Sequence, residues 1–440
     1  MAEYEAYKDS NIGKVGFIPS HWEITRIGNL FEEVSDRYET GTTEELPLLS
    51  VSEYYGIAKR SDKIADDSIL VRAESLDGYK ICRPGDIVSN IMLAWKGALG
   101  SSPYAGIVSP AYCIYRPKTV VNSRYFHYLF RTKAYTDVFY VHSTGLIDSR
   151  LRLYTPKFFA LYTPVPPVME QDLIVEYLDQ NTQHIDAIIA EAKASIDEYK
   201  AWKASIIYEA VTKGLDQDVE MKDSGIKWIG QIPRDWDVMK LKNIVTCMES
   251  GVSVNASQTA AAEGKIGVLK TSSVSKYHFR PEENKEVNND ELDRVSCSVK
   301  GNTIIVSRMN TPELVGACGY VKHDIPHLYL PDRLWQVHFS DSVVVKYVWY
   351  YLSSNYIRSY YASLSSGTSS SMQNISQGQF GNAYFLFPPK EIQQNIADSL
   401  DMRCEVIDAI IDEKEALIAD LEAYKKSLIF EVVTGKRKVC

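Results

Sequence analysis

The chain has 440 residues, of which 45% are hydrophobic and 24% are charged, a composition typical of a globular protein with about two to four domains. This composition excludes a disordered chain, a collagen and a small disulfide-stabilised protein. Its 48 basic residues against 57 acidic ones leave a formal net charge of −9. That charge at first argues against a nucleic-acid partner, because phosphate binding normally requires a basic surface.

The N-terminal segment contains acids where a signal peptide would be basic, and no apolar run approaches the ~18–20 residues that span a bilayer. We therefore expect a cytoplasmic protein without a membrane partner. The seven cysteines are scattered, odd in number and form no CxxC pair. This pattern is typical of reduced thiols rather than of disulfides or a zinc ribbon.

The segment Gly16–Ile24, with the pattern G-x-I-P-x-x-W, returns later in the chain as Gly230–Val238. From residue 125 to residue 212 the second copy follows at a fixed offset of 222 positions. Over the last 42 aligned pairs, which start at Gln171 and Gln393, 19 residues are identical. The chain is therefore a tandem repeat, and each half must be one copy of the same structural unit.

Each half begins with short strand-forming runs that are bounded by Gly, Pro, Asn and Asp. They cover residues 81–89 and 112–115 in the first half and residues 267–271, 303–307 and 334–339 in the second. An aromatic segment follows, Arg124–Tyr140 or Lys346–Leu364, which we predict to be one helix in each half. Each half should therefore start with a mixed but strand-rich domain.

Each half should end in a long helix. Val168–Lys213 and Lys390–Thr434 contain no Gly or Pro, and their apolar residues recur mostly at steps of three, four and seven. A Pro-Pro pair precedes each segment, and Gly214 or Gly435 follows it, as expected at helix ends. We predict that the helices bury their apolar stripes against each other as an antiparallel coiled coil about a pseudo-two-fold axis. Ordinary core helices of two separate domains are the alternative.

Motifs of catalysis are absent from the sequence. It has no Walker A, GxGxxG, GxSxG or HExxH pattern and no NPP[YF] motif of an amino-methyltransferase. Glu283-Asn-Lys285 has the form of a nuclease ExK pair but lacks a preceding Pro-Asp, and Cys318, His323 and His327 lack further ligands. We expect neither catalytic residues nor a metal in this chain.

The Gly/Ser-rich loop in each half has two interpretations. Ser365–Ser371 and its counterpart Ser143–Arg152 offer hydroxyls, backbone N–H groups and, in the first half, two arginines. Such groups can hold a phosphate oxygen. Hydroxyl-rich loops are equally common as plain connections, so the sequence favours neither interpretation.

Several features together resemble the specificity subunit of type I restriction–modification systems. They are the repeated G-x-I-P-x-x-W opening, the Gly85–Ser89 and Gly301–Arg308 strands, the Pro-Pro-x-x-x-Gln starts and the Ile-Asp-Ala-Ile-Ile helices. The resemblance implies an α+β fold with target-recognition domains at residues 1–166 and 229–388. It places long helices at residues 167–213 and 389–440 and a linker at residues 214–228. Each domain would read one half of a bipartite double-stranded DNA target.

The resemblance also implies partner subunits. The helical pair would set the spacer between the two half-targets and dock two DNA adenine methyltransferase (M) subunits, while motor and nuclease (R) subunits complete the complex. S-adenosylmethionine and ATP with magnesium would be bound by those partners, so that this chain carries no cofactor. It would be the non-catalytic component of the enzyme.

For DNA binding we select basic and amide residues on loops and strand ends, because these side chains read base edges, together with one loop hydroxyl. They are Lys59, Arg60, Asn90, Lys96, Arg124, Arg150, Arg152, Lys270, Lys276, Arg280, Arg308, Asn310, Arg333, Ser369, Gln373 and Asn374. For partner binding we select Ile185, Ile189, Trp202, Ile407, Ile411 and Tyr424 of the helices.

The net charge is unevenly distributed along the chain. The helical segments 167–213 and 389–440 carry −5 and −3, whereas Arg116–Lys157 has eight Lys and Arg against two Asp. Local basic stretches therefore lie in the strand-rich domains, where DNA contacts are expected. A coiled-coil scaffold with two protein-binding end domains is the alternative; it needs no basic loops, and its binding would respond weakly to salt. A self-sufficient methyltransferase or nuclease is disfavoured by the missing motifs.

Overall fold

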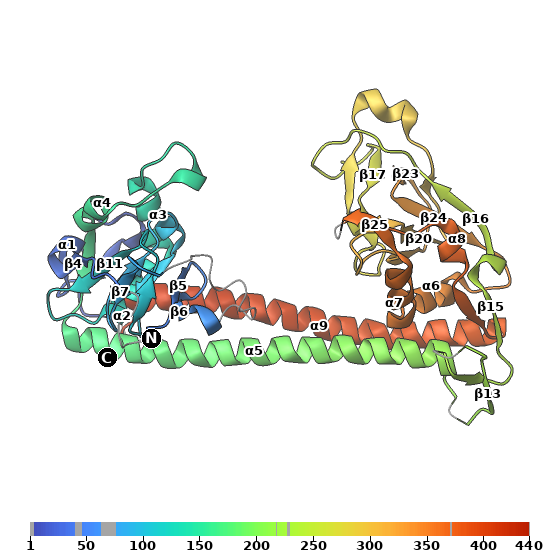
Figure 1. Cartoon of the computed structure of the whole chain (residues 1–440), viewed down its shortest axis with the longest axis horizontal. Helices are drawn as coiled ribbons and strands as arrows, with labels where there is room; N and C mark the ends of the chain where they lie inside the picture. Colours follow the sequence, from blue (N-terminus) through green and yellow to red (C-terminus); the bar gives the residue numbers. More distant parts are fainter. Residues whose placement is uncertain are drawn as a thin grey trace. The chain divides into compact units, whose positions relative to one another are not determined.

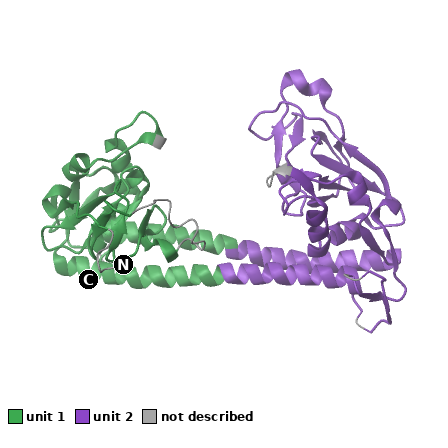
Figure 2. Ribbon diagram, viewed as in Figure 1, with its two compact units in different colours: residues 1–192, 415–440 green, residues 193–414 purple. Residues whose placement is uncertain are grey.

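The computed structural model describes residues 4–39, 46–62, 76–216, 218–226, 229–369 and 372–439, and Figure 1 shows its helices and strands. The chain forms two compact units, residues 1–192 with 415–440 (unit 1) and residues 193–414 (unit 2), as Figure 2 shows. Each unit contains one strand-rich domain and parts of both long helices, α5 (Val168–Lys213) and α9 (Lys390–Val433). The two predicted long helices are confirmed to within one residue.

The domain of unit 1 is built on a four-stranded antiparallel sheet in the order β4-β11-β8-β9. Its strands are β4 (Phe31–Val34), β11 (Cys113–Pro117), β8 (Ile87–Ser89) and β9 (Leu99–Ser101). Strand pairs β1 (Tyr7–Asp9) with β2 (Phe17–Pro19), β3 (Glu23–Arg26) with β12 (Tyr162–Val165), β5 (Leu49–Ser52) with β6 (Gly56–Lys59), and β7 (Lys80–Cys82) with β10 (Gly106–Val108) surround it. The helices are α1 (Ile27–Leu30), α2 (Ser123–Phe130), α3 (Lys133–His142) and α4 (Thr155–Ala160).

The domain of unit 2 repeats this sheet as β16-β24-β20-β22. These strands are β16 (Val245–Ser250), β24 (Leu334–Phe339), β20 (Thr303–Ser307) and β22 (Cys318–Val321). A second sheet orders β18 (Asn284–Glu286), β17 (Gly267–Leu269), β23 (Ile325–Tyr329) and β19 (Ser298–Val299), and a third orders β21 (Met309–Asn310), β26 (Met372–Asn374) and β25 (Ser366–Ser369). The pairs β13 (Met221–Asp223) with β14 (Gln231–Pro233) and β15 (Asp237–Lys240) with β27 (Tyr384–Phe387) complete the strands, and the helices are α6 (Val345–Ser353), α7 (Asn355–Leu364) and α8 (Gln377–Gly381).

Two local predictions are wrong. Residues 81–89 form two strands, because Arg83–Asp86 make a turn in which the Asp86 amide donates to the Arg83 carbonyl and Gly85 has a φ of 90°. The aromatic segment of each half is two helices instead of one. Each helix pair is interrupted at one extended hydroxyl residue, Thr132 or Ser354, whose hydroxyl donates to the carbonyl three residues earlier at 2.7 Å. A side chain that satisfies this carbonyl competes with continuation of the helix.

The repeated tryptophan motif closes the end of a long helix. Trp22 is fully buried, and its indole N–H donates to Glu170 of α5 at 3.1 Å. Gly435, which follows α9 with a φ of 69°, lies against Pro19, so closely that a Cβ at this position would be 2.2 Å from the proline ring. The tryptophan contact recurs in both units: a Cβ on Gly435 would lie 3.1 Å from the Trp22 ring, and a Cβ on Gly214 would lie 3.3 Å from the Trp236 ring. The glycines that end both helices are therefore required by close packing as well as by helix capping.

The long helices pack antiparallel, and an ion pair between them recurs at the offset of 222. Lys425 of α9 forms an ion pair with Asp186 of α5, and Lys203 of α5 forms the equivalent pair with Asp408 of α9, both at 2.6 Å. The core of unit 1 is continuous from Phe126 of α2 through Leu178 of α5 to Leu428 of α9. The two helices therefore pair with each other as a coiled coil and also belong to the cores of the strand-rich domains. Both interpretations of the sequence describe part of the structure.

Within the described part of the chain, no helix is both long and apolar enough to cross a membrane. The six described cysteines are free thiols. Burial raises the pKa of the Cys82 thiol to about 11, so this thiol stays protonated and unreactive at neutral pH.

Candidate nucleic-acid interface

The same arrangement of a strand end and a hairpin occurs in both units. In unit 1 the chain leaves β8, and the carbonyl of Ile91 accepts a hydrogen bond from the Leu153 amide at 2.9 Å. In unit 2 the chain leaves β20, and the carbonyl of Arg308 accepts from the Ile375 amide at 3.0 Å. The amide that donates follows a hairpin, which comprises residues 144–152 in unit 1 and the paired strands β25 (366–369) and β26 (372–374) in unit 2. We call this combination the strand-end site.

The strand-end site of unit 2 collects several of the predicted DNA-binding residues. Arg308 follows β20, Asn310 lies in β21, and Gln373 and Asn374 lie in the neighbouring β26, where Asn310 pairs with Gln373. Arg333 is exposed, and its carbonyl accepts from the Arg308 amide at 3.1 Å. Ser369 ends β25 in the same sheet, but its side chain is outside the described residues.

The polar groups at this site are only partly used by the chain itself. The Arg308 guanidinium lies 5.8 Å from the centre of the Trp335 ring. In the part of the chain that the structure describes, Arg308 Nε, Thr311 Oγ1 and Asn374 Oδ1 have no hydrogen-bond partner although they are buried. Buried polar groups normally have partners. A donor and an acceptor of this kind are what a polar ligand such as a nucleic acid would require.

The strand-end site of unit 1 is more basic. Arg150 and Arg152 are exposed on its hairpin, and Thr144 and Arg152 exchange backbone hydrogen bonds at 2.9 and 3.1 Å. Lys96 lies over the Trp95 ring, which contacts Tyr140, and the Tyr140 hydroxyl donates to Asp148 of the hairpin at 3.0 Å. One set of contacts therefore links Lys96 to the hairpin that carries both arginines.

Asn90 is an exception among the predicted residues of this site. It is buried, and its side-chain oxygen accepts from the Met92 amide at 3.2 Å in the turn after β8. In this structure Asn90 shapes the turn, and its contact with DNA stays a prediction. Asn favours such turns because its side chain can replace a backbone carbonyl.

Lys59 and Arg60 lie at the end of β6, where the Lys59 ammonium is 5.2 Å from the centre of the Tyr104 ring. Arg131, at the C-terminal end of α2, positions the hairpin β5–β6. The sequence did not single out this residue for the site. Its guanidinium donates to the carbonyls of Ser52 and Glu53 at the hairpin turn and to those of Gly97 and Leu99. Burial lowers the pKa of Arg131 to about 10. No sequence signal distinguishes it from the other arginines of its stretch.

Arg124 serves the fold. Its Nε donates to Asp179 of α5 at 2.7 Å, and Tyr128 donates to the same carboxylate at 2.6 Å. In unit 2 the equivalent residues Lys346 and Tyr350 bind Asp401 of α9 in the same way. This contact joins the domain to the helix in both repeats, and DNA binding by Arg124 stays a prediction.

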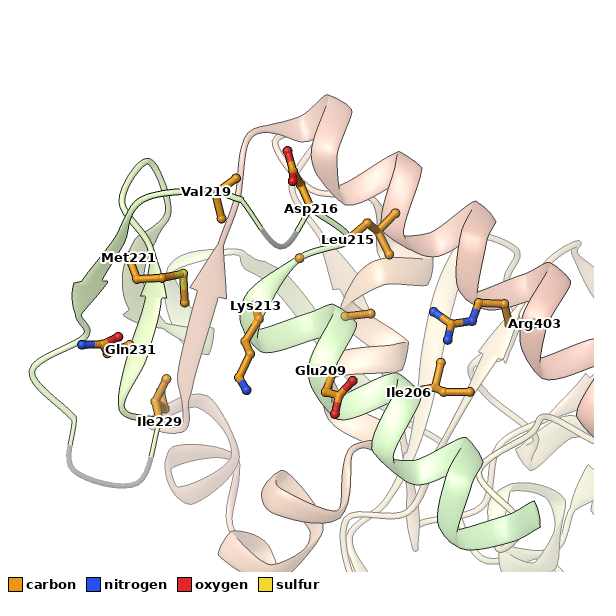
Figure 3. A pocket seen from close by; sticks show the side chains of 12 residues that line it. Ile206, Glu209, Lys213, Leu215, Asp216, Val219, Met221, Ile229, Gln231 and Arg403 are labelled. Atoms are coloured by element: carbon orange, nitrogen blue, oxygen red, sulfur yellow. The ribbon is translucent and has the colours of Figure 1, made fainter. Parts of the chain in front are cut away.

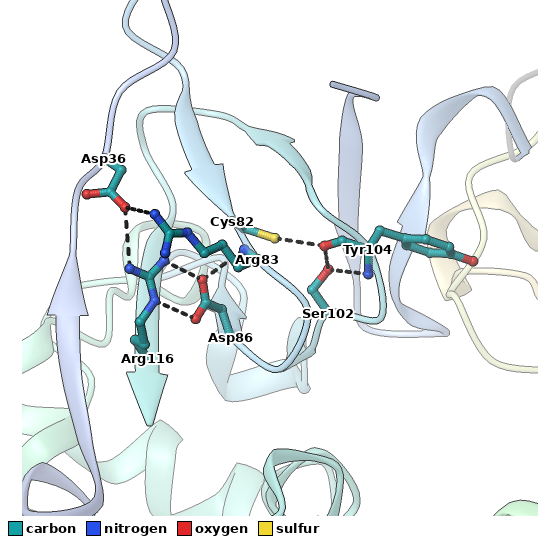
Figure 4. Close-up of polar contacts among 7 residues, drawn as sticks. All are labelled: Asp36, Cys82, Arg83, Asp86, Ser102, Tyr104 and Arg116. Carbon is teal, nitrogen blue, oxygen red and sulfur yellow. Dashed lines mark hydrogen bonds and ion pairs between the residues drawn. The ribbon is translucent and has the colours of Figure 1, made fainter. Parts of the chain in front are cut away.

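Arg116, the first residue of the most basic stretch, is also used inside the domain. Figure 4 shows its guanidinium bound to both oxygens of the buried Asp86, at 3.0 and 2.9 Å, and to Asp36 at 3.3 Å. Arg83 reaches the same Asp36 carboxylate at 3.7 Å. These hydrogen bonds raise the pKa of Arg116 above its ordinary value. Two of the eight basic residues of this stretch, Arg116 and Arg124, are therefore paired with carboxylates that are distant in sequence.

A second basic stretch, residues 265–280 of unit 2, also contains paired cations. Lys270 and Arg280 lie 3.6 and 3.8 Å from the carboxylate of Glu283. A hydrogen bond from Ser272, together with these two cations, lowers the pKa of Glu283. Lys276 is exposed between them. Only Lys276 of these three residues is unpaired within the described part of the chain.

The helix residues selected for partner binding fall into two groups. Ile185, Ile189, Ile407 and Ile411 are all buried, so they hold the helices together and are not accessible to a partner subunit. Trp202 and Tyr424 are about half exposed, at 53% and 50%, and they occupy equivalent positions of the two helices. Of the six selected residues, Trp202 and Tyr424 are the exposed ones, and partner binding stays a prediction.

A cavity of about 680 Å³ lies in unit 2 at the end of α5 (Figure 3). Apolar side chains such as Ile206 and Met221 line it together with the charged Glu209, Lys213 and Arg403. Among its described lining residues there is no pairing of a nucleophile with a base. No group of three or more His, Cys, Asp and Glu in the described chain could hold a metal ion.

Comparison with known proteins gives matches along nearly the whole chain. The family profile described as "Type I restriction modification DNA specificity domain" matches residues 233–422. The chain is 25% identical to the type I restriction enzyme MjaVIII specificity subunit of Methanocaldococcus jannaschii, over 98% of this chain and 97% of that protein. It is 22% identical to the EcoKI specificity subunit of Escherichia coli K12, over 80% of this chain and 75% of that protein.

Two solved structures share the fold. One is a chain from a study of complex assembly and conformational transition of the type I R-M system, with a TM-score of 0.66, 14% identity and coverage of 94% and 98% of the two chains. The other is the HsdS subunit from Thermoanaerobacter tengcongensis, with a TM-score of 0.50, 15% identity and coverage of 96% and 98%. The arrangement of two strand-rich domains and two antiparallel long helices is therefore common to these chains.

Proposed function

Because the chain belongs to the specificity subunits of type I restriction–modification systems, a non-catalytic family, we propose that its two domains, residues 1–166 and 229–388, each read one half of a bipartite DNA target. The observation that carries this proposal is the strand-end site, which recurs on the same scaffold in both units with different side chains. Arg150 and Arg152 occupy the hairpin of unit 1, whereas Gln373 and Asn374 occupy that of unit 2. Equal scaffolds with unequal side chains suit a target whose halves differ in sequence.

The side chains of each site match the chemistry of base recognition. Arginine donates two hydrogen bonds to the major-groove edge of guanine, and Asn and Gln form the equivalent pair with adenine. We therefore assign Arg308, Asn310, Gln373 and Asn374 to base readout in unit 2. In unit 1 we assign Arg150, Arg152 and Lys96 to base readout. We assign Lys59 and Arg60 to contacts with the phosphate backbone of the DNA.

The helices would serve the partner subunits. Trp202 and Tyr424 present equivalent half-exposed aromatic side chains, which suits docking of two identical methyltransferase subunits, since aromatic residues often dominate interfaces. S-adenosylmethionine and ATP would be bound by those partners. In a co-purification assay, Trp202→Ala and Tyr424→Ala should each weaken one methyltransferase contact, and the double variant should lose the partner. Substitution of exposed Val120 by Ala is the control.

The helical pair would also set the spacer. Four residues inserted near Ile196, with a matching insertion near Ile418, add ~6 Å of helix, or roughly two base-pair steps of ~3.4 Å. The methylated motif should then acquire a longer spacer with unchanged half-sites. An unchanged spacer in a folded insertion variant contradicts the ruler.

The decisive experiment maps N6-methyladenine across the genome with and without the gene, in a strain that expresses an active methyltransferase partner. Loss of methylation at one bipartite motif is the expected result. An unchanged methylome contradicts the proposal. A second measurement distinguishes DNA recognition from the scaffold alternative: the affinity of the assembled complex for the mapped duplex is determined at increasing salt concentration. Phosphate contacts produce a steep loss of affinity with salt, whereas protein contacts do not.

A further inference from the structure

The hairpin of unit 1 carries two apolar side chains in water. Leu146 is 100% exposed and Ile147 is 55% exposed, and in Figure 1 the segment that follows α3 projects from the body of its domain. Single exposed apolar residues are common on protein surfaces. Two adjacent ones at the tip of a projecting hairpin are less easily explained, because nothing in the fold gains from their position.

The hairpin holds this tip in a defined conformation. The Thr144 and Arg152 backbones pair at its base, and the Arg150 amide donates to the Ile147 carbonyl at 2.8 Å. The two sides of the hairpin lie so close that a Cβ on Gly145 would be 2.6 Å from the Arg150 carbonyl oxygen. Leu151 and Leu153 anchor the returning strand in the domain. The exposed pair is therefore presented on a braced support.

The charges beside the tip indicate what it meets. Arg150 and Arg152 are exposed on the same hairpin, and Lys96 is linked to it through Trp95 and Tyr140. Apolar tips flanked by cations suit a nucleic acid, in which the cations bind phosphates and the apolar side chains enter between bases. A protein partner with a basic surface would instead be attracted to the long helices, which are acidic.

We propose, resting on the function above, that Leu146 and Ile147 form a wedge that inserts at a base step of the first half-target and opens it. Proteins that insert Leu, Ile or Met in this way partly unstack the step and bend the duplex. The hairpin of unit 2 differs, since its described exposed apolar residue is Met372, at 48%. The wedge therefore makes the half-target of unit 1 the site of the stronger bend, and flexible pyrimidine–purine steps would be preferred there.

The test uses the complete complex with its methyltransferase subunits and a duplex that contains the mapped target. Fluorophores on either side of the first half-site report bending by energy transfer, and a second duplex carries the pair around the other half-site. The variant is Leu146→Ser with Ile147→Ser. Val120→Ser, which also removes an exposed apolar side chain, is the matched control.

The variant should lose the bend at the first half-site, retain that at the second, and bind roughly tenfold or more weakly, as expected when buried apolar groups are removed. Arg150→Gln should weaken binding while the bend persists. The wedge is refuted if the variant bends and binds DNA like the control. It is also refuted if the variant fails to assemble with methyltransferase subunits, because the tip then docks protein. Failure of the proposed function is recognised separately, since the wild-type complex would then ignore the mapped target.

Discussion

Acid should weaken unit 1 more than unit 2, because only unit 1 has a buried histidine in its first aromatic helix. His127 of α2 corresponds to Trp349 of α6 at the offset of 222. Its Nδ1 is buried without a hydrogen-bond partner in the described chain, and a Cβ on Gly100 would lie 2.4 Å from that atom. Burial, together with the nearby Arg131 and Arg124, lowers the pKa of His127 to about 3.

The sign of the effect follows from this lowered pKa. As the pH falls, the unfolded chain binds the proton first, since its histidine has a pKa of about 6.5. The stability that neutral His127 contributes is complete above that pH and is lost as the pH approaches 3. Between pH 7 and pH 5 the loss is at most about 2 kcal/mol, which increases the population of the opened unit by roughly thirtyfold.

Hydrogen exchange measured by mass spectrometry on the full chain would detect this opening, with rates corrected for the intrinsic effect of pH. Peptides from α2 should lose protection between pH 7 and pH 5, whereas those from α6 should lose much less. His278 lies beside Trp349, but it is half exposed and its pKa is lowered less by burial. His127→Phe should abolish the difference between the units. Parallel loss of protection in α2 and α6, or an acid-sensitive His127→Phe variant, would refute the reasoning.

Contacts that recur in both units provide further predictions. Gln171 is fully buried, accepts from the Asn122 amide at 2.9 Å and donates to the Pro166 carbonyl at 2.8 Å, so Gln171→Ala should destabilise unit 1 by ~1–3 kcal/mol. Gln393→Ala should destabilise unit 2 by the same amount and leave unit 1 unchanged. Hydrogen exchange measured separately in each unit distinguishes the two variants. The Lys425–Asp186 pair is partly exposed and should contribute less than about 1 kcal/mol. Lys425→Asp should lower the thermal midpoint slightly, and adding Asp186→Lys should restore it.

The long helices could be predicted from the sequence with their ends, because one physical pattern determines them. The segments lack Gly and Pro, repeat an apolar stripe and are bounded by residues that stop helices. The break at Thr132 could not be predicted, because Thr and Ser are tolerated inside helices as well as at their ends. At Thr132 the backbone becomes extended, with a ψ of 152°, while its hydroxyl donates to the carbonyl three residues earlier. The same type of hydrogen bond occurs inside a helix at Ser363 of α7, so the residue type does not reveal the break.

The sequence could not show which candidate DNA-binding residues form contacts inside the fold, because their partners are distant in sequence. Arg124 binds Asp179, which is 55 residues away, and Arg131 binds carbonyls up to 79 residues away. The sequence shows the charge of an arginine but not the carboxylate that folding brings to it. Among the basic candidates, Arg150, Arg152 and Lys276 are exposed and form no ion pair within the described part of the chain. An arginine or lysine that is exposed and has no ion-pair partner is available to bind DNA, whereas a paired one stabilises the fold.

That distinction predicts opposite effects for two arginines of one basic stretch. Arg116 neutralises the buried Asp86, so Arg116→Gln leaves a buried charge unpaired and should cost ~3–5 kcal/mol of stability. If the variant is assembled at a temperature where it is folded, the salt dependence of DNA binding should be unchanged. Arg150→Gln should leave stability unchanged and reduce the slope of log affinity against log salt by about one. If both variants change the slope of log affinity against log salt equally, the prediction is wrong. Ion pairing inside the fold would then not decide which arginine contacts DNA.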